Sequence, residues 1–115
     1  MFDPTNPLML DQLARRFGAL ADPVRLRLML ALKSGEQPVG ALSAELGVAQ
    51  PSVSKHLALL REAGLVEVRR AGNQAFYQVT DQSVFEMCKY VCQGVVRHLK
   101  QRQKQIQAAL PASSR

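Results

Sequence analysis

Apolar residues recur at helical spacing along most of the chain and change to a two-residue period near its middle. A first helix is predicted over residues 8–20, where leucines and a phenylalanine fall three or four positions apart. Asp22 and Pro23 then mark a second helix that runs to about Lys33, because Asp can cap a helix and Pro suits its first turn. The dense apolar positions of this second helix predict that it is largely buried.

The next segment has the pattern of two short helices joined by a tight turn. One helix is predicted from Gln37 through Leu46, and Gly47 ends it. The stretch 48–66 follows as a loop, a helix with one apolar face, and a stop at Gly64. Two short helices separated by a few residues around a glycine indicate a helix-turn-helix motif.

After these helices the apolar period becomes two. Residues 65–68 and 76–79 have the pattern of strands, and Gly72–Asn73 supplies turn chemistry between them. Arg69 and Arg70 lie in the connecting segment, so the predicted hairpin carries two positive charges beside its turn. A helix-turn-helix followed at once by a basic hairpin predicts a winged helix.

A long helix is predicted to close the domain. It begins near Ser83, which forms a capping-box pattern with Glu86, and it continues towards Ala109. The predicted fold is therefore mainly α with one β-hairpin, in the order of four helices, two strands and a last helix. Residues 8–109 form this domain, between a flexible arm at 1–7 and a flexible tail at 110–115.

The second helix of the helix-turn-helix has a polar amino-terminal end. Short hydrogen-bonding side chains and a cation gather there, opposite the apolar face, and this mixture suits a helix end in a DNA major groove. Polar residues also occur at helix starts for capping alone, so the helix by itself leaves both interpretations open. The candidate DNA-reading residues are Gln50, Ser52, Ser54, Lys55 and His56.

Composition and charge narrow the possible partners. The 115 residues suit one domain, and the net charge of +6 with a pI near 9.9 favours a polyanion, with nucleic acid ahead of a membrane or an acidic protein. No apolar run reaches the roughly 20 residues that span a bilayer, and the amino terminus lacks a signal-peptide pattern. We therefore expect a cytoplasmic protein whose two cysteines, Cys88 and Cys92, are mostly reduced.

Residues 17–80 resemble the ArsR/SmtB family of bacterial winged-helix repressors. The resemblance is strongest in three pieces, and the hairpin and the long last helix follow at the expected distances. These pieces are Ala21-Asp22-Pro23-Val24-Arg25-Leu26, Ser52-Val53-Ser54-Lys55-His56-Leu57 and Leu60-Arg61-Glu62-Ala63-Gly64-Leu65-Val66.

The resemblance implies a homodimer, formed through the first and last helices, that binds an inverted-repeat operator and is released by an inducer. It places the polar residues of the recognition helix in the groove, and Arg69 and Arg70 beside phosphates or the minor groove. His56 has two open roles, as a phosphate donor or as a structural residue at the helix turn. A two-fold dimer would also bury apolar stripes on the first and last helices and set two recognition helices about 34 Å apart.

The metal sites that the resemblance would lead one to expect lack most of their ligands in this sequence. Pro38 and Gly40 stand where the family's third-helix site has cysteines. At the family's last-helix site Asp81 is present and His98 stands alone, while the other positions hold non-ligating residues: Gln82, Ser83, Gly94 and Arg97.

Cys88 and Cys92 are the remaining candidates for the inducer site. Their i, i+4 spacing on a helix brings the Cβ atoms to about 5–6 Å, too far for an unstrained disulfide but close enough to chelate one soft ion. Thiolates favour thiophilic ions, so arsenic(III), antimony(III) or a similar metal is the predicted inducer, and no cofactor is required. The partner subunit or water would complete the ligand set. Redox or persulfide sensing and simple packing remain alternatives.

Two other function classes compete with a repressor. A winged helix used only for protein–protein contact would not need the basic wing or the polar helix start. An enzyme is the least favoured of the three function classes, because the sequence has no phosphate loop, no Ser/His/Asp set and only two histidines.

Overall fold

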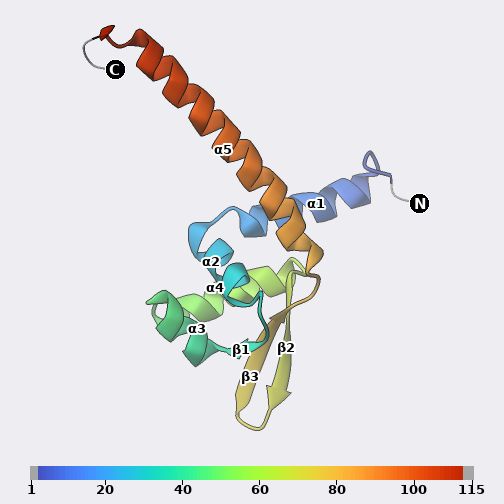
Figure 1. Ribbon diagram of the computed structural model, residues 1–115. Helices are drawn as coiled ribbons and strands as arrows, with labels where there is room; N and C mark the ends of the chain where they lie inside the picture. The colour runs from blue at the N-terminus through green and yellow to red at the C-terminus, as the bar shows by residue number, and fades with distance from the viewer. Residues whose placement is uncertain (1–2, 113–115) are drawn as a thin grey trace. The chain divides into compact units, whose positions relative to one another are not determined.

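The computed structural model describes residues 3–112, which form the five predicted helices together with three strands (Figure 1). The chain divides into two compact units, Met1–Asp81 and Gln82–Arg115. In chain order the elements are α1 (Pro7–Leu20), α2 (Pro23–Ala31), β1 (Gln37–Pro38), α3 (Val39–Leu46), α4 (Gln50–Glu62), β2 (Val66–Ala71), β3 (Gln74–Val79) and α5 (Ser83–Ala109).

Side-chain caps set the starts of the first two helices. Asn6 accepts hydrogen bonds from the backbone N–H groups of Leu8 and Met9, so α1 begins at Pro7, one residue earlier than predicted. Asp22 accepts from the N–H of Arg25 at 3.0 Å, which confirms the predicted start of α2. The Arg25 N–H and the positive charges near this carboxylate hold the pKa of Asp22 below its usual range.

The prediction that α2 is largely buried was wrong for one of its faces. Leu28, Met29 and Leu32 are buried, but Leu26 and Leu30 are exposed. Leu26 and Leu30 are four residues apart and therefore share a side of the helix that does not face the core. The number of apolar residues in a helix does not reveal how many sides of it are covered.

The third helix begins two residues later than predicted, because Gln37 and Pro38 form a strand. They pair antiparallel with Tyr77 and Phe76, so the predicted hairpin is the larger part of a three-stranded sheet with the order β1-β3-β2. Pro38 is compatible with an edge strand, where its missing N–H is not needed by a second neighbour.

The hairpin strands are longer than predicted and contain both wing arginines. Ala71 pairs with Gln74, and the two residues between them form the whole turn. Gly72 has φ of 60° and Asn73 does not have positive φ, which is the arrangement of a type II′ turn. Arg69 and Arg70 are therefore in β2, rather than in a connecting loop, because cross-strand pairing continues to the tight turn.

The helix-turn-helix packs its apolar faces into one core, as predicted. The side chains of Val53, Leu57 and Leu60 on α4 have no exposed surface. Gly47, with φ of 67°, ends α3, and the Ser43 hydroxyl donates to the Val48 carbonyl across the turn at 2.6 Å.

Gly64 ends α4 in a backbone conformation that strains any other residue. Its φ is 80°, and a Cβ there would lie 3.0 Å from a guanidinium nitrogen of Arg16 on α1. The Thr80 hydroxyl donates to the Gly64 carbonyl at 2.7 Å, which ties the end of β3 to the end of the recognition helix.

The second unit is built around α5, a single helix of 27 residues. It begins at Ser83, with Gln82 in the capping position, so Ser83 is inside the helix and the predicted capping box with Glu86 was wrong. Among residues 3–112, no helix combines the length and the apolar character needed to cross a bilayer.

Candidate nucleic-acid interface

The amino-terminal half of α4 presents polar side chains around a buried framework. Gln50, Ser54 and Lys55 are exposed, whereas Ser52 and His56 are partly buried. Within the described part of the chain, the side chains of Ser54 and Lys55 make no hydrogen bond or ion pair, so their polar atoms remain free for a ligand. None of the five predicted reading residues is therefore buried in the core, and Ser54 and Lys55 are exposed without a partner among the described residues.

Gln50 lies beside the tip of the wing. A shallow hollow of about 370 Å³ has Gln50 on one wall and the wing residues Asn73 and Gln74 on another, with the start of α3 between them. Amides such as these donate to phosphate oxygens as well as to base edges. The sequence predicts Asn73 and Gln74 only as connecting residues of the hairpin, and nothing in the local sequence indicates that Gln50 lies near them.

His56 is held inside the first unit by α2. Its Nδ1 lies 3.3 Å from a guanidinium nitrogen of Arg25 and 3.9 Å from a carboxylate oxygen of Asp22. The imidazole side chain is 21% exposed. Of its two predicted roles, the structural one has direct contacts here, while the remaining exposure leaves room for a phosphate contact as well.

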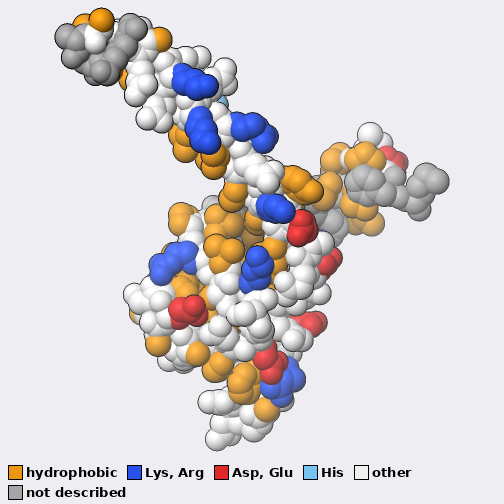
Figure 2. All heavy atoms as spheres, viewed as in Figure 1, with side chains coloured by type: hydrophobic (Ala, Val, Ile, Leu, Met, Phe, Trp, Pro, Cys, Tyr) orange, Lys and Arg blue, Asp and Glu red, His pale blue; other side chains and the backbone are white. Residues whose placement is uncertain are grey.

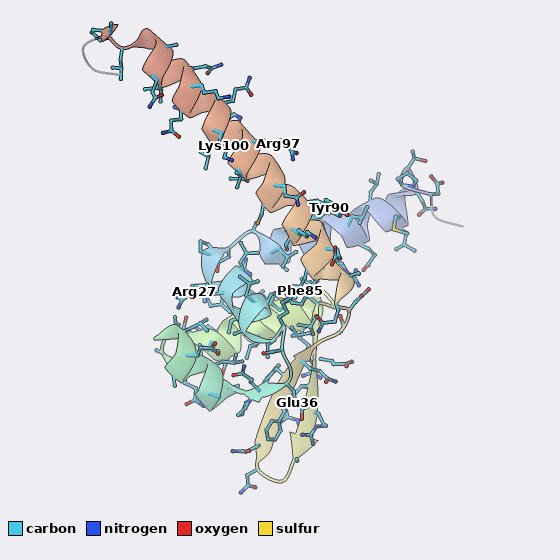
Figure 3. The ribbon with its side chains drawn as sticks, viewed as in Figure 1. Arg27, Glu36, Phe85, Tyr90, Arg97 and Lys100 are labelled. Atoms are coloured by element: carbon cyan, nitrogen blue, oxygen red, sulfur yellow. The ribbon has the colours of Figure 1, made fainter. Side chains whose placement is uncertain are left out.

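The two wing arginines are not equivalent. The guanidinium of Arg69 donates twice to the Glu36 carboxylate, at 2.6 and 3.1 Å, and its carbon lies 4.8 Å from the centre of the Phe76 ring. The Arg69 hydrogen bond and charge hold the pKa of Glu36 below its usual range. Glu36, labelled in Figure 3, immediately precedes β1, so this pair fastens the wing to the segment leading into α3.

Arg70 is the freer cation of the wing. It is exposed, and within the described residues it has no carboxylate partner. Because the charge of Arg69 is already paired with the Glu36 carboxylate through two hydrogen bonds, Arg70 is better placed to meet a phosphate. The role of Arg69 is to hold the wing in place.

The positive charge of the chain is unevenly divided between the two units. Residues 82–115 hold six of the 15 Lys and Arg residues but only one of the nine Asp and Glu residues, so they carry nearly all of the net charge of +6. Figure 2 shows Lys and Arg side chains along α5, and Arg97 and Lys100 project from it in Figure 3. The charge of the first unit is close to balanced, so its suitability for DNA depends on the local arrangement of its residues.

The two cysteines lie in the first half of α5. Both are free thiols; Cys88 is partly buried and Cys92 is exposed. They lie on a stripe with Val91, Val95 and Leu99, whose side chains are half or more exposed. Within residues 3–112, no group of three or more His, Cys, Asp or Glu side chains is arranged to hold a metal ion. Two thiols from one chain would therefore need further ligands from elsewhere.

Comparison with known proteins identifies the family. Residues 22–68 match the model of the arsR family of bacterial regulatory proteins. The chain is 37% identical over 95 residues to a biofilm growth-associated repressor of Xylella fastidiosa, an alignment that spans 76% of this chain and 83% of the relative. The chain belongs to the ArsR family.

Two further proteins show the range of its relatives. A probable mercury resistance operon repressor of Streptomyces lividans is 40% identical over 77 residues, covering 67% of this chain and 62% of the relative. The solved structure of a homodimeric winged helix-turn-helix DNA-binding domain from Mycobacterium bovis, a possible ArsR-family transcriptional regulator, has a TM-score of 0.73 and 32% identity, covering 88% of this chain and 93% of that one.

Membership in this family confirms the predicted resemblance and the winged-helix fold. The protein is a DNA-binding transcription regulator and not an enzyme. The piece Ala21 to Leu26, one of the three that carry the resemblance, includes the N-cap and the first residues of α2. Arg25, in this piece, was not predicted as a site residue. One signal could have indicated it, because Arg25 is a charged residue at the start of a helix that is otherwise mostly apolar.

Proposed function

We propose that the protein is a homodimeric repressor that binds an inverted-repeat operator and is released by a thiophilic metal or metalloid ion. The observation that carries the DNA-binding part is the polar amino-terminal half of α4, whose side chains Ser54 and Lys55 are exposed on a helix with a fully buried opposite face. A rigid helix with free donors at its start meets the requirements of major-groove reading.

The proposed roles follow from the geometry. Ser52, Ser54, Lys55 and Gln50 contact base edges or nearby phosphates, and Arg70 contacts a phosphate from the wing. Arg69 supports the wing through its hydrogen bonds to Glu36. His56 contributes from the side of α4 that faces α2.

The homodimer is supported by apolar surface that one chain leaves exposed. On α1, Leu8, Leu10 and Phe17 are 70%, 50% and 52% exposed. The stripe on α5 is similarly exposed, and large apolar patches of this kind mark protein interfaces. A related structure is described as homodimeric, which supports the same assembly here.

Replacing Lys55 by alanine tests the DNA-binding role. The operator is first selected from random duplex DNA with the unmodified protein, and we expect an inverted repeat to be enriched. Lys55→Ala then weakens binding by about tenfold or more, since each of two symmetric copies gives up an interaction worth about 1 kcal/mol. The matched control is Arg61→Ala, which removes an exposed cation from the other end of α4 and leaves affinity within about threefold.

Salt dependence alone does not suffice for this test. Residues 82–115 carry most of the net charge, so they alone can produce a steep salt dependence with any DNA. The ratio of affinities for selected and scrambled DNA is the deciding measurement. Absence of an enriched inverted repeat, or equal effects of Lys55→Ala and Arg61→Ala, would instead favour a winged helix used for protein–protein contact.

The inducer part of the proposal depends on Cys88 and Cys92. Their spacing allows both thiolates to bind one soft ion, and a relative is named as a probable mercury resistance repressor. Arsenite and antimonite are the first candidates. Since one chain supplies only two thiols, the third ligand comes from the partner subunit or from water.

Changing both cysteines to serine separates DNA binding from release. The double variant should keep its affinity for the operator and lose the response to ions, whereas in the unmodified protein a coupling of about 1–3 kcal/mol gives roughly 5–150-fold weaker binding. The reduced protein is titrated with arsenite, antimonite, Cu(I), Cd(II), Zn(II) and a persulfide.

The single variants Cys88→Ser and Cys92→Ser distinguish the alternatives. Chelation requires both thiols, so each single variant should lose the response to arsenite. A response only to persulfide would favour a redox sensor, in which a thiol bonds to sulfur instead of binding an ion. A double-serine variant that still responds to thiophilic ions would show that the two cysteines only pack.

A further inference from the structure

Arg25 connects three helices of the first unit through one guanidinium group. Its Nε donates to the Ala19 carbonyl at 2.6 Å, and one terminal nitrogen lies 3.5 Å from the Gly18 carbonyl, both near the end of α1. The other terminal nitrogen lies 3.3 Å from Nδ1 of His56 on α4. Carbonyls in the last turn of a helix lack intrahelical partners, so a cation is favourable there.

The contact with Arg25 favours one of the two neutral tautomers of His56. A guanidinium group has donors only, so a hydrogen bond between these side chains requires Nδ1 of His56 to accept. A neutral imidazole that accepts at Nδ1 carries its hydrogen on Nε2. Arg25 therefore favours the Nε2–H tautomer.

Asp22 completes the surroundings of this ring. Its carboxylate lies 3.9 Å from the same Nδ1 and also accepts from the Arg25 backbone N–H. Arg25 lies closer to Nδ1 than Asp22 does, so the acceptor role of Nδ1 is the one that the shorter contact supports.

We propose that Arg25 is a positioning residue that holds His56 as the Nε2–H tautomer, so that His56 offers an N–H donor to a DNA backbone phosphate. This inference rests on the proposed DNA-binding function. It joins the two roles predicted for His56, since one nitrogen is structural and the other meets the ligand. The side chain is 21% exposed, and His56 lies one helical turn after Ser52, so the two residues share a side of the proposed reading helix.

The tautomer can be measured without DNA. Long-range ¹H–¹⁵N NMR spectra of the unmodified protein should show the hydrogen of His56 on Nε2 at a pH where the ring is neutral. Arg25→Lys keeps the charge but cannot bond to both Ala19 and His56 through one planar fork, and we expect a mixture of tautomers. The matched control is Arg27→Lys on the same helix, because Arg27 donates to the Leu46 carbonyl at 2.9 Å and should leave His56 unchanged.

DNA binding then tests the donor. His56→Phe removes both nitrogens and should weaken binding to the selected operator by about tenfold, because each of the two copies loses a hydrogen bond to a phosphate. The slope of log affinity against log salt should not change, since a neutral imidazole neutralises no phosphate charge. His56→Gln places an amide N–H near the position of Nε2 and should retain most of the operator affinity. Thermal unfolding of each variant confirms that it is folded at the assay temperature.

Three outcomes would overturn the inference. These are a His56 hydrogen on Nδ1 in the unmodified protein, an Arg25→Lys tautomer identical to that of the Arg27→Lys control, and an unchanged operator affinity for folded His56→Phe. Failure of DNA binding as a whole appears separately, as equal effects of Lys55→Ala and Arg61→Ala, and leaves the tautomer measurement intact.

Discussion

Replacing Leu57 by alanine will lower the free energy of unfolding by about 2–5 kcal/mol. The Leu57 side chain has no exposed surface and lies on the apolar face of the recognition helix, between Val53 and Leu60. Alanine removes buried methyl groups and leaves a cavity that close-packed neighbours fill only in part. Since a domain of this size has a total stability of about 5–15 kcal/mol, the loss is a large fraction of it.

The control for this variant lies two residues away on the same helix. Leu59 is 46% exposed, so Leu59→Ala makes the same chemical change outside the core and should cost about 1 kcal/mol or less. Urea unfolding followed by circular dichroism measures both, at one protein concentration, because dimerisation makes stability depend on concentration. Equal losses for the two variants would mean that α4 does not face the core as described.

Replacing Val95 by glutamate will separate the proposed dimer into monomers. Val95 is 50% exposed on the α5 stripe, where Val91 and Leu99 lie one helical turn away on either side. An unpaired charge buried in an interface costs about 3–5 kcal/mol, and a two-fold interface contains the substitution twice. The dimer dissociation constant should therefore rise by at least about 1000-fold.

Sedimentation velocity and operator binding give two independent readouts of this change. A monomer can occupy only one half of an inverted repeat, so operator affinity should fall together with dimerisation. Gln93→Glu is the control, because it adds the same charge to the same helix at an exposed position away from the stripe. If Val95→Glu remains dimeric, the stripe is not the interface, and α1 with its exposed Leu8 becomes the surface to test.

The sequence determined the helices, the hairpin and the core of the helix-turn-helix. Periodicity placed Val53, Leu57 and Leu60 on one side of α4, and all three are fully buried. Local chemistry was sufficient for this, because a cap, a glycine with positive φ or a two-residue turn is decided by neighbouring residues. The exposed stripes on the first and last helices could likewise be predicted, since a short chain cannot cover every apolar face.

Only the tertiary structure decided the partners of the charged residues. Arg69 and Glu36 are 33 residues apart, and Arg25 and His56 are 31 apart, so no local pattern brings them together. The short strand at Gln37 has the same origin, because it exists only through its pairing with Tyr77. Side-chain identity showed which residues could meet DNA, but the long-range contacts determine which of these, such as Lys55 and Arg70, are free to do so and which, such as Arg69, are already bound within the protein.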